Sequence, residues 1–277
     1  MVLADEQAVG QICATACIKS NLIQCQTLVR QAAHAGAKVL FLPEASDYIA
    51  TSAEESLALA QSSYCSHFLS ALMDDAKDKG LHINVGVHEV ASDRRLKNSL
   101  LWIDDEGRIT QSYQKIHLFD VDIKDGPILK ESKNVEPGQK IVPPFETPVG
   151  RVGLAICFDL RFPEIGLALR RQDTEVITYP SAFTVPTGKA HWESLLRARA
   201  IETQSYVVAA AQGGPHNEKR RSYGHSMVIN PWGEIVGELG DEYAEPQLLT
   251  ADIDLDLVSK IRKEMPLLRR TDVYPEI

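Results

Sequence analysis

Cysteine is scarce in this 277-residue sequence, and its pattern excludes two common uses. The cysteines are odd in number and none forms a CxxC pair, which argues against a secreted disulfide framework and against a cysteine-rich zinc site. They are Cys13, Cys17, Cys25, Cys65 and Cys157. Reduced thiols fit a cytoplasmic protein best, and an organellar form stays open.

Long apolar runs and basic surfaces are missing as well. No segment approaches the roughly 18 consecutive apolar residues of a membrane span. Asp5 and Glu6 stand where an export signal would carry basic residues. The net charge is −9, and the one basic cluster, at 219–221, does not make the basic surface that binding to nucleic-acid phosphates requires. We therefore expect no membrane span, no export and no nucleic-acid partner.

What is present is the composition of a globular α/β protein. Apolar residues make up 44% and charged residues 24%, which suits a sizeable core, and we expect a single domain over residues 1–277. Short runs rich in Val and Ile alternate with stretches of helical period. In the first half, a strand, a helix, a strand, a helix, a strand and a hairpin are predicted at 8–16, 21–35, 38–43, 54–79, 82–89 and 98–114.

The second half repeats this order. Its strand, helix, strand, helix, strand and hairpin are predicted at 151–156, 163–172, 175–180, 188–203, 206–212 and 223–238. Two similar halves indicate two packed sheets with helices outside, a four-layer α-β-β-α sandwich with a site where strand ends meet. The intervening segment 118–144 is polar and broken by Pro and Gly, and irregular stretches longer than roughly 12 residues are commonly functional.

Cys157 ends a buried-strand pattern, and Pro163 soon after it can begin a helix at its first turn. A strand-to-helix elbow exposes a nucleophile at the sheet edge and aims backbone N–H groups at its target. A helix start nearby also favours the thiolate. The alternative is that Cys157 is a small buried apolar residue, as most free cysteines are.

Two further side chains stand at strand ends. Glu44 ends the apolar run 39–43, and burial there would raise the pKa of its carboxyl and suit it to move protons. Lys115 ends the first hairpin, where it can donate to a developing oxyanion. A plain loop glutamate and a surface lysine are the alternatives. His117 needs no role in this scheme and is expected to be structural.

The order Glu44, Lys115, Cys157 resembles that of the nitrilase superfamily, and long sequence words match along nearly the whole chain. These words are FLPEA at 41–45, KIHLFDVDI at 115–123, ESKNVEPG at 131–138, GLAICFDLRFPE at 153–164, TYPSAFTVPTGKAHWESLLRARAIETQ at 178–204 and SYGHSMVINPWGE at 222–234. The resemblance implies a thiol amidase that uses neither a metal nor an organic cofactor.

By this resemblance Cys157 is the nucleophile, Glu44 the general base and then acid, and Lys115 stabilises the tetrahedral intermediate together with the backbone N–H of Phe158. Glu131 matches a glutamate that helps to hold the substrate amide; the alternative is a solvated loop charge. Together these residues would hydrolyse a small carboxamide through a thioester.

Within the superfamily, the words YPSAF, AHWESLLRARAIETQ and AAAQGG followed by RRSYGHSM are most similar to the deaminated glutathione amidase branch. The implied reaction is a metabolite repair that releases 2-oxoglutarate and cysteinylglycine. Rival activities are an omega-amidase acting on alpha-ketoglutaramate, a true nitrilase, and an inactive scaffold that binds partners. The resemblance also implies a homodimer or higher homo-oligomer, with the C-terminal tail 266–277 a candidate participant.

The 2-oxo acid end of that substrate needs a cationic clamp. Arg161 follows Cys157 closely, and an arginine fork suits a carboxylate, although Arg161 could instead pair with Asp159 or Glu164. Ser181, Phe183 and Thr187 follow the strand predicted at 175–180 and are expected to reach the same pocket.

Overall fold

The computed structural model describes residues 5–91, 94–122 and 128–275 and contains two six-stranded sheets. The first sheet has the order β16-β1-β2-β3-β4-β5. Its strands are β16 (Gln247–Ile253), β1 (Asp5–Gln11), β2 (Val39–Phe41), β3 (His82–Val90), β4 (Leu96–Ile103) and β5 (Ile109–Gln114).

The second sheet has the order β15-β14-β11-β10-β9-β8. Its strands are β15 (Ile235–Glu238), β14 (Met227–Ile229), β11 (Tyr206–Ala209), β10 (Val176–Thr178), β9 (Gly150–Leu154) and β8 (Phe145–Thr147). Two small hairpins lie outside both sheets: β6 (Asp120–Asp122) with β7 (Ile128–Lys130), and β12 (Gly213–Pro215) with β13 (Arg221–Tyr223).

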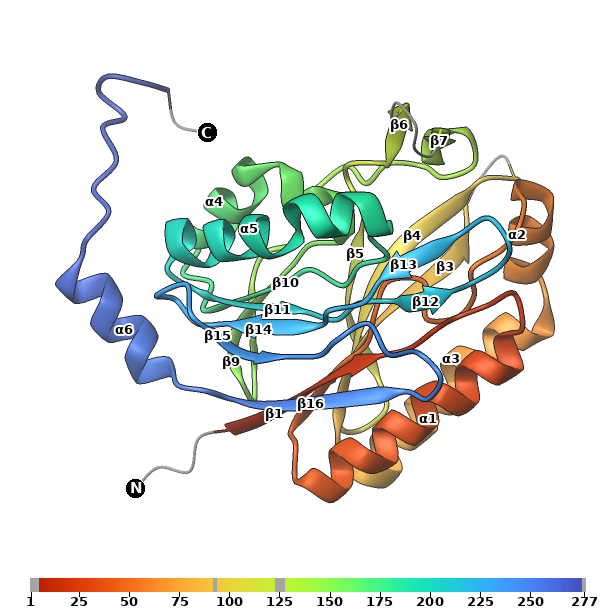
Figure 1. Ribbon diagram of the computed structural model, residues 1–277. Coiled ribbons are helices and arrows are strands. Elements are labelled where there is room, and N and C mark those ends of the chain that lie inside the picture. Colours follow the sequence, from red (N-terminus) through yellow and green to blue (C-terminus); the bar gives the residue numbers. More distant parts are fainter. Residues whose placement is uncertain (1–4, 92–93, 123–127, 276–277) are drawn as a thin grey trace.

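Helices cover the outer face of each sheet, as Figure 1 shows. The first sheet carries α1 (Ile18–Ala35), α2 (Ala53–Ala60) and α3 (Ser63–Lys79), and the second carries α4 (Pro163–Arg170) and α5 (Val185–Thr203). The helix α6 (Leu255–Glu264) follows β16 and leads to the C-terminal tail. The predicted four-layer α-β-β-α sandwich is confirmed.

Successive side chains along a strand point alternately into two different parts of the hydrophobic core. In β1 and β2, Val9 and Phe41 pack into the cluster between the sheets, whereas their neighbours Ala8 and Leu40 face the cluster under α1 and α3. Successive strand side chains point to opposite faces, so a strand covered on both sides must be apolar throughout. This explains the continuous apolar runs in the sequence.

The structure corrects several predicted elements. The helix predicted at 54–79 is two helices, because Ser62 adopts an extended backbone and begins α3 afresh. The strand predicted at 8–16 ends at Gln11, so Cys13 lies beyond it. The hairpin predicted from 223 begins at Met227, since 221–223 pair with β12 instead. The strand β16, which joins the first sheet beside β1, and the helix α6 had no counterpart in the predicted elements.

Parallel strands present their carboxyl ends at one edge of each sheet. The strands β1, β2 and β3 are parallel neighbours in the first sheet, as are β9, β10 and β11 in the second. In open α/β sheets, ligands bind outside the carboxyl ends of such strands. Among the described residues, no helix combines the length and apolar character that crossing a bilayer requires.

Candidate active site

Glu44 lies just beyond the end of β2, and its carboxylate accepts hydrogen bonds from three donors. Its Oε1 accepts hydrogen bonds from Asn98 Nδ2 at 2.7 Å and Lys115 Nζ at 2.8 Å. Its Oε2 accepts one from the backbone N–H of Ala182 at 2.9 Å. The Nε2 group of Gln212 donates to the Glu44 carbonyl at 2.9 Å, which anchors the backbone. The buried carboxylate is therefore held by groups from both halves of the chain.

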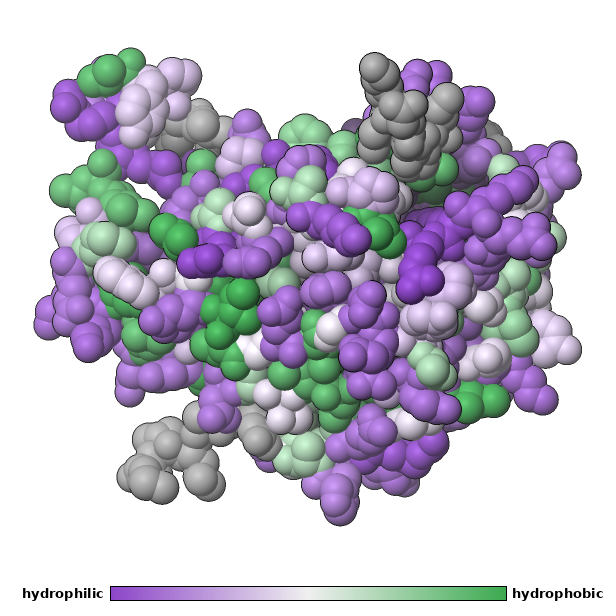
Figure 2. Space-filling model, viewed as in Figure 1, coloured by the Kyte–Doolittle hydropathy of each residue, from purple (hydrophilic) through white to green (hydrophobic). Residues whose placement is uncertain are grey.

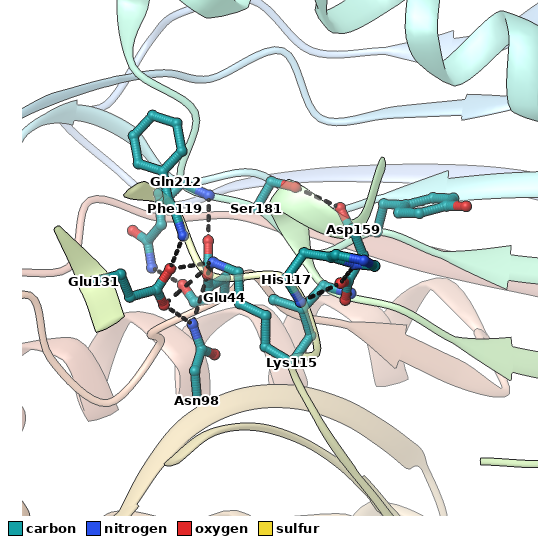
Figure 3. Close-up of polar contacts among 12 residues, drawn as sticks. Glu44, Asn98, Lys115, His117, Phe119, Glu131, Asp159, Ser181 and Gln212 are labelled. Carbon is teal, nitrogen blue, oxygen red and sulfur yellow. Dashed lines mark hydrogen bonds and ion pairs between the residues drawn. The ribbon is translucent and has the colours of Figure 1, made fainter. Parts of the chain in front are cut away.

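Lys115 follows β5 directly and is almost completely buried, with 2% of its side chain exposed. Its Nζ lies 2.8 Å from Glu44 Oε1 and 3.0 Å from Glu131 Oε2. A buried ammonium group is costly unless opposite charges surround it. The surface-lysine alternative is thereby excluded, and Lys115 sits between two carboxylates (Figure 3).

Glu131 begins a short 3-10 turn, Glu131–Lys133, right after β7. Its Oε2 accepts a hydrogen bond from the Phe119 backbone N–H at 2.7 Å, and its Oε1 accepts one from Asn98 at 3.1 Å. Figure 3 shows Glu131, Asn98 and Lys115 converging on Glu44. Glu131 is therefore a fixed member of this cluster and not a solvated loop charge.

Cys157 is the first residue of the 3-10 turn η3 (Cys157–Arg161), between β9 and α4. Its φ of 46° is unusual for a residue other than glycine, and such strain collects at functional sites. The thiol lies beside the Glu44 carboxylate, close enough for each group to shift the pKa of the other. Within the turn the first backbone bond is donated by Asp159 N–H, so the N–H of Phe158 lies at the open end of the turn. This is the predicted elbow.

The charge states of these groups differ from the sequence-based expectations. Burial by itself would raise the pKa of Glu44, but the Lys115 ammonium and the surrounding donors outweigh it and lower the pKa to about 2. Burial and the Glu44 charge raise the pKa of the Cys157 thiol. Lys115 keeps its proton, since Glu131 and Glu44 raise its pKa well above the usual value despite burial.

Two expectations were therefore wrong. The carboxyl of Glu44 does not gain a higher pKa, because a buried cation touches it. Cys157 does not rest as a thiolate, because an ionised carboxylate faces it and α4 begins only at Pro163. The resting pair is a thiol beside a carboxylate, which is the starting state for removal of the thiol proton.

A cavity of about 280 Å³ opens on this cluster. Glu44, Lys115, Glu131 and Cys157 all line it. Among the described residues, no group of three or more His, Cys, Asp or Glu side chains is arranged to hold a metal ion. The arrangement combines a thiol, a proton acceptor and a fixed cation in one enclosed space.

Comparison with known proteins agrees with this arrangement. The sequence profile of the carbon–nitrogen hydrolase family matches residues 8–263. The chain is a carbon–nitrogen hydrolase. The hydrolase is 49% identical over 272 residues to "Probable hydrolase nit2" of Schizosaccharomyces pombe, covering 98% of this chain and 99% of that protein. It is 43% identical over 274 residues to the deaminated glutathione amidase of Homo sapiens, covering 96% and 83%.

Solved structures also resemble the hydrolase. The Caenorhabditis elegans NitFhit protein superimposes with a TM-score of 0.91 at 38% identity, covering 99% of this chain and 67% of that one. An amidase variant from Nesterenkonia sp. AN1, solved after Michael addition of acrylamide at its active site cysteine, gives a TM-score of 0.78 at 25% identity, covering 94% and 97%. The likeness therefore extends to a relative with a reactive cysteine.

Only some of the predicted substrate-binding residues line the cavity. Phe158, Phe183 and Thr187 line the cavity of the hydrolase. Ser181 does not: it is fully buried, and its hydroxyl donates to the Tyr179 carbonyl at 2.9 Å. The expectation for Ser181 is corrected, because strand β10 ends at Thr178 and the chain has turned inward at Ser181.

Arg161 lies beside the cavity and is not one of the residues that line it. Its guanidinium sits over the rings of Phe158 and Phe183, 5.7 and 5.6 Å from their centroids, and contacts His191 Nδ1 at 3.3 Å. Burial lowers the pKa of Arg161, and the nearby Cys157 opposes this. Its role as a carboxylate clamp stays a prediction.

Several residues of the site carried no sequence signal strong enough to single them out. Asn98, which bridges Glu44 and Glu131, is one polar residue in a strand pattern. Asp159 is buried and accepts hydrogen bonds from the Tyr113 hydroxyl at 2.7 Å and from His117 at 2.9 Å. The hydrogen bond between His117 and Asp159 confirms the structural interpretation of His117. Arg220, which was noted in the sequence only as part of the basic cluster 219–221, lines the cavity.

Proposed function

We propose that this hydrolase cleaves deaminated glutathione into 2-oxoglutarate and cysteinylglycine through a thioester on Cys157. The observation that carries the chemistry is the contact of one buried carboxylate, Glu44, with both the Cys157 thiol and the Lys115 ammonium. The choice of substrate is supported by the human, bovine and mouse relatives named deaminated glutathione amidase.

In the first half-reaction, Glu44 accepts the thiol proton while the Cys157 sulfur bonds to the amide carbon. The carbonyl oxygen becomes an oxyanion, which accepts hydrogen bonds from the Lys115 ammonium and the Phe158 backbone N–H. The carbon–nitrogen bond then breaks as Glu44 returns the proton to the leaving nitrogen. An amine departs and a thioester remains.

In the second half-reaction, a water molecule attacks the thioester carbon as Glu44 takes its proton. The carbon–sulfur bond breaks, the acid is released, and the proton returns to Cys157. Glu44 serves both halves because its carboxylate lines the cavity beside the Cys157 thiol.

Lys115 has a second effect on this cycle. Its contact makes Glu44 a weak base in the free protein, with a pKa of about 2. When negative charge develops on the substrate oxygen, that oxygen competes with Glu44 for the Lys115 ammonium. Glu44 then becomes more basic at the stage when it accepts the thiol proton. This coupling favours proton transfer from Cys157 to Glu44 in the transition state over the same transfer in the resting protein.

A comparison of substrates on one preparation tests the proposal. We expect kcat/KM to be highest for deaminated glutathione, lower for alpha-ketoglutaramate and negligible for a simple nitrile. Cys157→Ala should lower turnover by at least about 1,000-fold with unchanged circular dichroism. A higher kcat/KM for alpha-ketoglutaramate would reassign the protein to omega-amidase activity, and activity retained by Cys157→Ala would remove the proposed nucleophile.

The inactive-scaffold alternative makes a different prediction. A dead scaffold needs no accessible thiol, whereas a catalytic Cys157 should react with iodoacetamide and should be protected by substrate. Failure of labelling together with absent turnover of all three substrates would favour the scaffold.

For cellular location we propose the cytoplasm, supported by five cysteines that are all free.

A further inference from the structure

The cavity has a chemical gradient from its floor to its rim. Glu44, Lys115 and Cys157 are all buried and form the floor. Thr51 and Ser52, which also line the cavity, are exposed and belong to the rim. A substrate that reacts at the floor and carries a second polar group therefore extends toward the rim.

Apart from histidine, the cationic side chains among the described lining residues are Lys115, Lys130 and Arg220. Lys115 is already shared by Glu44 and Glu131, so it has no charge to spare for a substrate carboxylate. Lys130 is exposed. Arg220 is half-buried, and no ion pair joins its guanidinium to a carboxylate in the part of the chain that the structure describes.

Arg220 stands in the turn between β12 and β13, and its backbone is fixed. Its N–H donates to Asn217 Oδ1 at 3.0 Å, and its carbonyl accepts from the His216 N–H at 2.9 Å. The hairpin is tied to the cavity wall by the bond from Tyr223 N–H to the Phe183 carbonyl, at 2.9 Å. Figure 1 shows the turn of this hairpin pointing toward α2, whose first residue, Ala53, also lines the cavity.

The neighbouring histidine does not add charge. Burial, and then the charge of Arg220, lower the pKa of His216 to about 4, so its ring is neutral near pH 7. The carbonyl of Ala14 can only accept, so Nδ1 donates to it at 2.7 Å, and Nε2 is left to accept from the Ser222 hydroxyl at 2.7 Å. Arg220 is therefore the one guanidinium among the described lining residues, and it is carried by a turn whose backbone is fixed.

We propose that Arg220 binds a carboxylate at the far end of the leaving amine. The inference rests on the proposed function, in which the leaving group is cysteinylglycine, a dipeptide that ends in a carboxylate. The ammonia released from alpha-ketoglutaramate offers no such group. Arg220 is thus a specificity residue that separates a peptide-like leaving group from a primary carboxamide.

The placement of the two arginines supports this division of tasks. Arg161 lies close enough to Cys157 for the two groups to influence each other's charge, which suits the acyl side of the substrate. Arg220 instead influences His216 in the rim hairpin. A guanidinium fork can hold a carboxylate with two parallel hydrogen bonds, whereas the shorter reach and single point charge of an ammonium cannot.

Two substrates that differ in one carboxylate test this proposal: deaminated glutathione and its C-terminal glycinamide. For the wild-type protein we expect a higher kcat/KM for the free acid, mainly through KM, because the contact lies far from the reacting atoms. Arg220→Gln should lower kcat/KM for the free acid roughly 10- to 100-fold and leave the glycinamide and alpha-ketoglutaramate nearly unchanged.

Arg221→Gln is the matched control, because Arg221 is exposed and its guanidinium lies over the Tyr243 ring, 5.1 Å from the centroid. It should leave both substrates unaffected. An equal loss on acid and glycinamide in Arg220→Gln, or no loss on either, overturns the role of Arg220 while the proposed function stands. Hydrolysis of alpha-ketoglutaramate alone by the wild-type protein overturns the proposed function and this inference together.

Discussion

At the scale of the residue, the site depends on the charge of one buried lysine. Without Lys115, Glu44 and Glu131 would be two carboxylates joined through the same Asn98 amide, and burial would raise the pKa of Glu44. With Lys115 in place, Glu44 stays ionised next to a thiol that stays protonated. The residue that stabilises the oxyanion therefore also prepares the base.

A second buried ion pair lies at the cavity wall and predicts a pH effect on stability. His88 lines the cavity, stacks on Tyr48, and contacts Asp47 through Nδ1 at 2.9 Å. Burial opposes the charged ring, but Asp47 outweighs it and raises the pKa of His88 above the usual 6.5. The folded state thus binds the proton more tightly than the unfolded chain.

For His88→Gln we expect a pH-dependent loss of stability. The wild-type contribution is fully present below about pH 6.5 and is lost as the pH rises through the folded pKa, because the unfolded chain is the weaker proton binder. A hydrogen bond to a charged group is worth roughly 1.5–3 kcal/mol. Denaturant titrations from pH 6 to 9 should show the gap between wild type and variant shrinking. The exposed His67→Gln is the control, and a gap that grows with pH would contradict this account.

At the scale of the element, the position of Glu44 depends on how closely β3 approaches the end of β2. Gly86 in β3 accepts a hydrogen bond from the Ser46 N–H at 2.8 Å. A Cβ atom at Gly86 would lie 2.6 Å from Glu44 Cα and 2.8 Å from the Pro43 carbonyl oxygen. Both are backbone atoms that cannot turn away, so only glycine allows this approach.

Gly86→Ala should therefore displace the general base. We expect kcat to fall roughly 10- to 100-fold, as misplacement by about 1 Å can do, and the free energy of unfolding to fall by about 1–3 kcal/mol. Steady-state kinetics and denaturant unfolding measure the two effects. Gly166→Ala in α4 is the control, since its nearest atom is a side-chain carbon at 3.3 Å. Wild-type kcat in Gly86→Ala would show that the approach does not position Glu44.

At the scale of the whole molecule, the C-terminal tail stands apart from the layered body. Figure 1 shows the segment after α6 extending away from both sheets, and Figure 2 shows hydrophobic as well as hydrophilic side chains along it. Leu268 is 85% exposed and Val273 69%. Exposed large apolar side chains on an extended segment mark a surface that a partner can cover. We propose a second copy of the chain, in keeping with the superfamily resemblance.

Sedimentation or light scattering should then give a mass of at least twice the 30.6 kDa of one chain. A chain that ends at Met265 should form smaller assemblies, and Leu268→Glu should weaken assembly because it buries a charge. The control is Lys263→Glu, a charge change at an exposed position of α6. A wild-type protein of monomer mass at micromolar concentration would contradict the proposal.

The sequence by itself determined the layered architecture and the three reacting groups. The resemblance of long sequence words to the nitrilase superfamily assigned the roles of Glu44, Lys115 and Cys157. Runs that are apolar throughout predict strands covered on both faces, and Glu44 and Cys157 stand at the ends of two such runs. These signals are local, because strand period and strand ends can be read from neighbouring residues. The break between α2 and α3 and the pairing of β16 with β1 were missed, since one depends on a single extended residue and the other on a partner at the opposite end of the chain.

Only the tertiary structure decided the charge states and the wall of the cavity. The pKa of Glu44 depends on Lys115, which lies 2.8 Å away in space and far away in the chain, and burial by itself pointed in the opposite direction. Ser181 is buried, with its hydroxyl donating to the Tyr179 carbonyl, and Arg220 lines the cavity because the hairpin β12–β13 packs against Phe183. The protonation of a group and its access to the cavity both depend on neighbours from distant segments of the chain. The sequence therefore identifies the reacting groups, whereas the fold decides their protonation and their position in the cavity.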